Sequence, residues 1–166
     1  MWIWDWIKNL FVSSNNPGTP VKSVSDMKLG RILKGQLPTA RFELADENYA
    51  VVKKNWLLHP FYNYYKKVLK GLKISGWTED FDCDDFARLF FSIAQACHAK
   101  GNTKNQGISV GLMFYVEEEE YGMIYGHAIN VAIVDDDLSV IFIEPQTGKE
   151  KCLTESERES CWFVYF

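Results

Sequence analysis

The chain of 166 residues lacks several patterns that would place it in a functional class at once. Its four cysteines form no C-x-x-C pair, which argues against a zinc knuckle or a thioredoxin-type motif. Its net charge is −4, so we expect no nucleic-acid partner. It has no bilayer-length apolar run and no signal peptide, so we expect a cytoplasmic protein with free thiols. The alternative is that the protein is exported, in which case Cys152 and Cys161 could form a disulfide.

What the chain does have begins with an aromatic N-terminus, MWIWDWIKNLF. Its apolar residues recur at helical spacing, which predicts an amphipathic helix over residues 1–12. The segment 13–20, SSNNPGTP, has the composition of a linker, and 21–166 then forms a single domain. We expect the N-terminal helix to pack on the body of the protein. Docking on a partner or on a membrane interface stays open, although the polar face of the helix is not basic.

The rest of the chain places helices before strands. Apolar spacing predicts helices near 25–33, over 60–74 and, most strongly, over 84–99. Segments rich in Val, Ile, Phe and Tyr predict strands at 108–116, 127–134, 138–144 and 161–166. This order is typical of an α+β fold with an antiparallel sheet.

Cys83 stands in an unusual place, inside the acidic run TEDFDCDDF at the start of the predicted helix 84–99. Helical spacing puts it on the apolar face, where the free N–H groups and the dipole of a helix start lower the pKa of a thiol. Asp82 and Asp84 work against a thiolate if they point at the sulfur. The alternative role for Cys83 is that of a small buried hydrophobe, as for Cys97.

His127 and Glu144 are predicted to meet across a hairpin. His127 opens the strand 127–134 on its apolar face, and Glu144 closes the strand 138–144. A turn through 135–137 puts His127 opposite residue 144, 145 or 146. A carboxylate at the end of an apolar strand is costly unless it is paired. Thiol, imidazole and carboxylate together predict a nucleophile, a base and an orienting group, although a neutral buried histidine explains His127 alone.

These residues resemble a known family. The run 82–87, DCDDFA, resembles the D-C-[DE]-D-[FY]-A signature of transglutaminase-like cysteine peptidases in the papain-like superfamily. The runs 126–128, GHA, and 144–146, EPQ, are similar to the His and acidic elements of that group. The whole set also resembles the papain-like domain of a fungal agglutinin. The resemblance covers about residues 76–150 and departs where Trp77 replaces the oxyanion-hole glutamine of papain.

The resemblance implies a papain-like/transglutaminase-like α+β fold, in which the helix bearing Cys83 packs on an antiparallel sheet bearing His127 and Glu144. It implies a cysteine hydrolase, foremost a peptidase, that acts on a peptide or protein substrate through a thioester acyl-enzyme. The catalytic residues would be Cys83, His127 and Glu144.

Two alternatives to a peptidase stay open. One is an amidase or transglutaminase-type acyl transferase, and the other is a catalytically inactive binding protein on the same fold. The resemblance also implies a calcium site, with Asp82, Asp84 and Asp85 as metal ligands and Gln146 as a further candidate. The favourable effect of acidic charges at a helix start explains the same aspartates without a metal.

Overall fold

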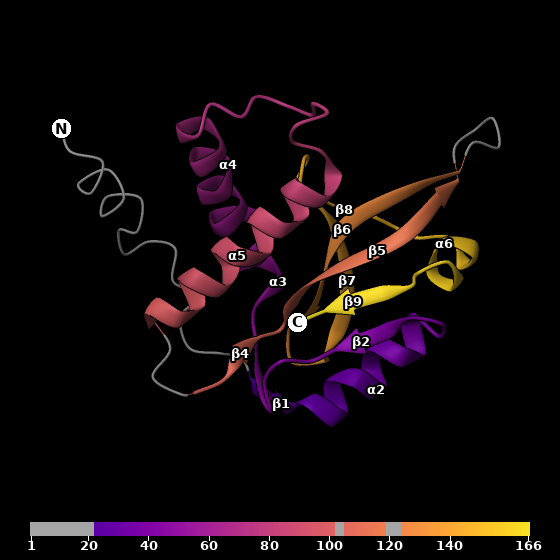
Figure 1. The fold of residues 1–166 in the computed structure, drawn as a ribbon. Coiled ribbons are helices and arrows are strands. Elements are labelled where there is room, and N and C mark those ends of the chain that lie inside the picture. The colour runs from indigo at the N-terminus through magenta and orange to yellow at the C-terminus, as the bar shows by residue number, and fades with distance from the viewer. Residues whose placement is uncertain (1–21, 102–104, 119–123) are drawn as a thin grey trace.

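The computed structural model describes residues 22–101, 105–118 and 124–166 (Figure 1). The predicted aromatic helix over 1–12 and the linker over 13–20 therefore lie outside the described residues. Within these described ranges, no helix is both long enough and apolar enough to cross a membrane.

The structure has six helical segments in its described ranges, and two of them, α2 and α6, begin at a side-chain cap. In order they are α2 (Asp26–Gln36), α3 (Lys54–Trp56), the π-helical turn η2 (Leu57–Phe61), α4 (Tyr62–Gly71), α5 (Cys83–Gly101) and α6 (Glu155–Glu159). The Ser25 hydroxyl accepts a hydrogen bond from the backbone N–H of Lys28 at 3.3 Å, which confirms the predicted start of α2. Thr154 and Glu157 form a capping box at α6.

The described strands form two sheets. The larger sheet has the order β2-β9-β5-β6-β7-β8, and the smaller has the order β1-β3-β4. The larger sheet consists of β2 (Arg41–Glu43), β5 (Val110–Glu118), β6 (Ile124–Val134), β7 (Ser139–Glu144), β8 (Lys149–Glu150) and β9 (Phe163–Tyr165). The smaller sheet consists of β1 (Lys22–Ser25), β3 (Asn48–Val51) and β4 (Gly107–Ile108).

The two faces of the larger sheet carry different helices, and side chains of β6 alternate between them. Helix α5 runs along β5 and β6, where Ala132 joins the same core as Phe90 (Figure 1). Asn130 ties this face together, because its buried Nδ2 donates to the carbonyl of Ala87 at 3.0 Å. On the other face, Ile129 packs in one core with Leu33 of α2. Side chains on one strand therefore meet two separate cores.

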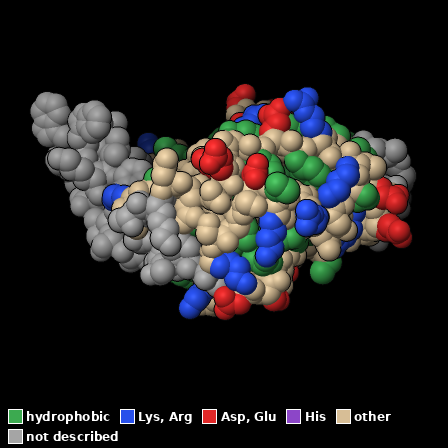
Figure 2. All heavy atoms as spheres, turned by 90° about the horizontal axis from the view of Figure 1, so that it is seen from below, with side chains coloured by type: hydrophobic (Ala, Val, Ile, Leu, Met, Phe, Trp, Pro, Cys, Tyr) green, Lys and Arg blue, Asp and Glu red, His purple; other side chains and the backbone are tan. Residues whose placement is uncertain are grey.

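The outer side of α2 faces solvent. Lys28, Arg31 and Lys34 are exposed there, three residues apart along the helix. The face of the molecule seen from below in Figure 2 shows basic side chains mixed with acidic and apolar ones.

The predicted papain-like fold class, with a helix on one antiparallel sheet, is wrong. The larger sheet is mixed, because β2 pairs with β9 in parallel, and a second sheet joins β3 to β4 in parallel. The strands that make this difference are two to four residues long. Strands this short show no apolar period, and their partners lie far away in the sequence, so spacing alone does not reveal them.

Candidate functional site

Cys83 opens α5, as predicted, but its environment disfavours the thiolate. The side chain is partly buried beside Ala87, Phe114 and Ala128. Burial raises the pKa of the thiol, and the charges of Asp82 and Asp84 raise it further. A hydrogen bond from the backbone N–H of Ala128 offsets part of this effect. The prediction that the helix start lowers the thiol pKa is therefore wrong, because burial and the two carboxylates outweigh the hydrogen bonds from backbone N–H groups.

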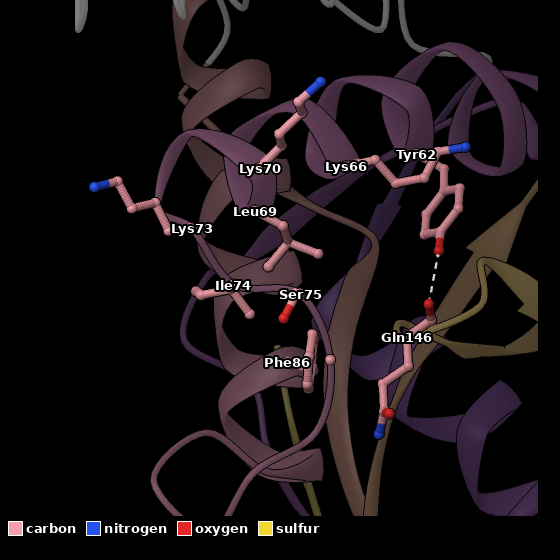
Figure 3. Close-up of a pocket in the computed structure, with 10 residues that line it drawn as sticks. Tyr62, Lys66, Leu69, Lys70, Lys73, Ile74, Ser75, Phe86 and Gln146 are labelled. Atoms are coloured by element: carbon pink, nitrogen blue, oxygen red, sulfur yellow. Dashed lines mark hydrogen bonds between the residues drawn. The ribbon is translucent and has the colours of Figure 1, made fainter.

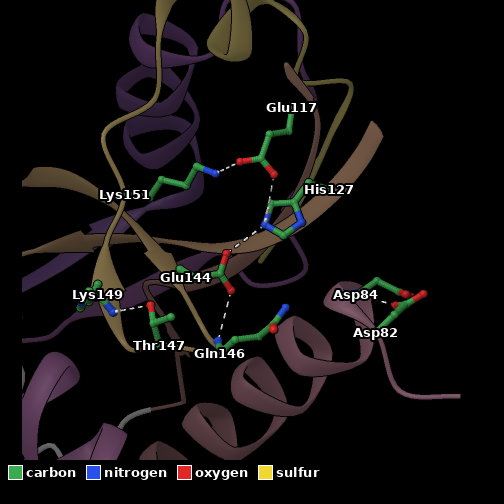
Figure 4. Close-up of polar contacts among 9 residues, drawn as sticks. All are labelled: Asp82, Asp84, Glu117, His127, Glu144, Gln146, Thr147, Lys149 and Lys151. Atoms are coloured by element: carbon green, nitrogen blue, oxygen red, sulfur yellow. Dashed lines mark hydrogen bonds and ion pairs between the residues drawn. The ribbon is translucent and has the colours of Figure 1, made fainter. Parts of the chain in front are cut away.

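His127 and Glu144 meet as predicted. The imidazole Nε2 lies 2.9 Å from Glu144 Oε2, and both side chains are largely buried (Figure 4). The other carboxylate oxygen of Glu144 accepts the backbone N–H of Gln146 at 3.1 Å. Burial raises the pKa of Glu144, but the hydrogen bonds from His127 and Gln146 outweigh it and hold the pKa below its usual value. Among the described residues, no hydrogen bond joins Cys83 to His127.

Two charged residues next to His127 were missed in the sequence. Glu117 Oε2 lies 3.9 Å from His127 Nε2, and Lys151 forms an ion pair with Glu117 (Figure 4). Lys151 Nζ also stands 5.5 Å from the centre of the Tyr115 ring, whose edge-on contact with His127 spans 5.7 Å between centroids. Glu117 begins the run EEEE, which resembles a solvated turn. Glu117 follows Tyr115 by two residues and therefore lies on the same face of the strand, and this spacing could have predicted its place near His127.

The three aspartates at the start of α5 come together. Carboxylate oxygens of Asp82, Asp84 and Asp85 all lie within 4.8 Å of one another. Asp82 Oδ1 accepts the backbone N–H of Asp84 at 3.1 Å, and Arg88 forms an ion pair with Asp84. The hydrogen bond to Asp82 raises the pKa of Asp84, because carboxylates at this separation repel unless a proton or a cation lies between them. Clustered hard oxygen donors suit calcium, while capping and Arg88 account for part of the cluster without a metal.

An exposed aromatic surface adjoins the start of α5. The indole of Trp162 is 48% exposed, and its ring lies 6.1 Å from the ring of Phe114, which packs against the same small apolar cluster as Cys83. A side chain built at Gly126 would begin 3.6 Å from the indole, so glycine there leaves the indole uncovered. Trp162 lies inside the predicted strand 161–166, and residue spacing gives no sign that its indole is exposed to solvent.

Comparisons with known proteins place this chain among the agglutinins. A family model described as Agglutinin C-terminal matches residues 49–150. No curated protein matches the chain.

Two solved structures share the fold. The "PSL1a-E64 complex" is 24% identical, with a TM-score of 0.67, and the match covers 87% of this chain and 51% of that one. Polyporus squamosus lectin bound to the human-type influenza-binding epitope Neu5Acα2-6Galβ1-4GlcNAc is 23% identical, with a TM-score of 0.64. That match covers 87% of this chain and 49% of the lectin chain. The chain thus spans about half the length of both structures.

These findings correct the expected identity and activity. The fold is that of the lectin structures, not of a papain-like peptidase, and the matching family is an agglutinin family. The predictions of a transglutaminase-like cysteine peptidase and of hydrolase activity are therefore wrong. Local motifs around Cys83 and His127 misled because they cover a few residues, while the family match extends over 102 positions, 49–150 inclusive. The chain belongs to the Agglutinin C-terminal family.

Proposed function

We propose that this protein is a carbohydrate-binding agglutinin-type protein without an enzymatic role. Its glycan would contact the surface formed by Trp162, Phe114 and the acidic start of α5. Membership of the Agglutinin C-terminal family supports a binding protein. The observation that carries the site is the exposed indole of Trp162, whose neighbour Phe114 packs against the same apolar cluster as Cys83.

The chemistry of this surface suits a sugar. A pyranose ring presents polarised C–H groups on one face and hydroxyl groups at its edge. The flat indole offers an apolar platform for the C–H face, and carboxylate oxygens accept hydrogen bonds from hydroxyl groups. Asp82 and Asp84 provide such oxygens at the start of α5, one helical turn or less from Cys83.

The charge of the surface indicates which glycans to try first. A structural neighbour was solved with a sialylated epitope, which supports a glycan as the class of ligand. Sialic acid is anionic, however, and Asp82, Asp84 and Asp85 would repel it at short range. We therefore propose that neutral galactosides bind this surface more tightly than sialylated ones.

Binding to immobilised neutral and sialylated glycans, followed by titration calorimetry of the best binders, tests the proposal. Trp162→Ala should weaken binding about tenfold or more, because it removes an aromatic contact surface. Met27→Ala is the matched control, since Met27 is 71% exposed on α2 and lies away from this surface. Absence of glycan binding, or equal binding by the Trp162→Ala variant and the native protein, would overturn the proposal.

The earlier assignments of individual site residues stay predictions. Cys83, His127 and Glu144 were predicted as catalytic residues, and Asp82, Asp84 and Asp85 as ligands of calcium. The three aspartates cluster in space, so the calcium site can be tested by calorimetric titration of chelator-treated protein with calcium. Asp85→Asn should weaken calcium binding, and Asp80→Asn, outside the cluster, is the control. A cytoplasmic location likewise stays a prediction.

A further inference from the structure

A second candidate binding site lies between α4 and α5, away from Trp162. It is a cavity of about 430 Å³, which falls in the usual range of small-molecule sites. Its wall comes from α4 and the loop that follows, its floor includes Phe86 of α5, and Gln146 lies on the opposite side (Figure 3). The carbonyl of Gln146 accepts a hydrogen bond from the Tyr62 hydroxyl at 3.0 Å, which holds the two sides together.

The lining divides into an apolar interior and a cationic rim. Leu69, Ile74 and Phe86 supply apolar surface near the middle, and the side chains of Lys66, Lys70 and Lys73 extend outward around it (Figure 3). Within the part of the chain that the structure describes, none of these three lysines forms an ion pair. Lys66 Nζ lies over the Tyr62 ring at 5.1 Å from its centre, so three positive charges without an anionic partner line this apolar hollow on a protein whose net charge is −4.

The backbone at Lys73 gives an independent reason to look here. Lys73 follows the C-cap of α4, Leu72, and lies in the left-handed region at φ 62°; the backbone N–H of Ile74 then bonds to the carbonyl of Leu69 at 3.0 Å. Glycine is the residue favoured at this position after a helix end, because a long side chain such as lysine is strained in the left-handed region. Lysine therefore costs some stability relative to glycine here, while its side chain adds a third positive charge to the lining of the cavity.

We propose that this cavity binds an amphipathic anion, namely a carboxylate carried on an apolar chain or ring. The apolar body contacts Leu69, Ile74 and Phe86, and the carboxylate meets the ammonium groups at the rim. Burial of the apolar part provides most of the affinity, and the lysines select for negative charge. The site is separate from the glycan surface, so each proposal can fail without the other.

Three probes separate these contributions in titration calorimetry with the full chain. Decanoate has both the apolar body and the charge, decanol has the same body without the charge, and acetate has the charge alone. We expect decanoate to bind most tightly, decanol more weakly and acetate not measurably. Equal binding of decanoate and decanol would overturn the role of the lysines, and no binding of decanoate would overturn the site.

The lysines of α4 offer a matched pair of variants. Lys70→Gln removes a rim charge, and Lys67→Gln removes the same charge from the same helix outside the cavity. Lys70→Gln should weaken decanoate binding roughly two- to fivefold, as expected for a partly solvated ion pair, while Lys67→Gln leaves it unchanged. Equal loss in both variants would show a general effect of charge and would contradict a defined site.

Lys73→Gly sharpens the test, because the proposal expects binding and stability to move in opposite directions. Glycine relieves the backbone strain at φ 62°, so the thermal midpoint should stay the same or rise. Loss of the ammonium group should weaken decanoate binding roughly two- to fivefold. A variant that is as stable as the native protein and binds decanoate equally well would overturn the role of Lys73.

Discussion

Gly148 is the position at which the structure makes its sharpest stability prediction. It lies in the turn between β7 and β8 at φ 70°, and its N–H bonds to the carbonyl of Glu144 at 2.7 Å. A Cβ added there would lie 2.3 Å from the Tyr62 ring, far inside van der Waals contact. The ring has little room to move, because Tyr62 is buried and its hydroxyl is bonded to Gln146. Gly148→Ala should therefore strain both the backbone and the packing.

The magnitude follows from these two effects. The left-handed backbone conformation costs an alanine about 1–2 kcal/mol. Overpacking against the Tyr62 ring adds about 1–3 kcal/mol. The free energy of unfolding should fall by about 3 kcal/mol, which for a domain of this size lowers the thermal midpoint by roughly 6–12 °C. Urea unfolding followed by circular dichroism measures the first quantity, and a thermal scan measures the second.

A double-mutant cycle distinguishes the two effects. In a Tyr62→Ala background the clash disappears, so Gly148→Ala should cost only the backbone strain of about 1–2 kcal/mol. Gly76→Ala is the control, because a Cβ at Gly76 meets no atom within 4 Å. A loss below about 0.5 kcal/mol, or the same loss with and without the Tyr62 ring, would refute the reasoning.

Three further predictions concern buried polar groups and thiols. The folded state holds the pKa of Glu144 below its ordinary value, so the stability it contributes is present above the unfolded pKa and is lost as pH falls through the folded pKa. Glu144→Gln should thus flatten the loss of stability in urea titrations as pH falls below the ordinary glutamate pKa of about 4.3, and an unchanged slope would contradict this role. Asn130→Leu should cost about 2–4 kcal/mol in the same assay, since it leaves the carbonyls of Ala87 and Gly111 without a buried donor. Iodoacetamide at neutral pH should modify exposed Cys152 faster than Cys83, whose pKa is raised by burial, whereas an activated nucleophile at Cys83 would reverse that order in mass spectrometry.

Much of the helical and hairpin structure was predictable, because long periodic segments carry a strong signal. The predicted helix over 84–99 corresponds to α5, Cys83–Gly101, whose buried residues follow the expected apolar face. The predicted strand 127–134 lies within β6, the predicted strand 138–144 corresponds to β7, which begins one residue later at Ser139, and the contact of His127 with Glu144 is confirmed. In each case the signal is local, within one element or across one short turn.

The rest depends on contacts between distant segments. The strand β2 is three residues long, and its partner β9 lies near residue 163, so neither length nor period reveals the pairing. Strand β5 continues past its apolar residues to Glu118, and this brings Glu117 close to His127. The run of glutamates reads as a solvated turn, so the sequence hides this extension of the strand. The pKa of Cys83 is raised by burial and by the charges of Asp82 and Asp84. Residue spacing along the sequence reveals neither the burial of the thiol nor the strength of these charge interactions.

The position of β9 has a consequence for how the chain must be made. This strand lies inside the larger sheet, between β2 and β5. Thr39, just before β2, bonds to the carbonyl of Cys161 across 122 positions of sequence. At common rates of translation, β2 therefore waits roughly 6–24 s on the ribosome before its partner is synthesised. Once β5 has been made, its edge stays open to other chains until β9 is synthesised, so we expect this edge to be a site of aggregation in the nascent chain.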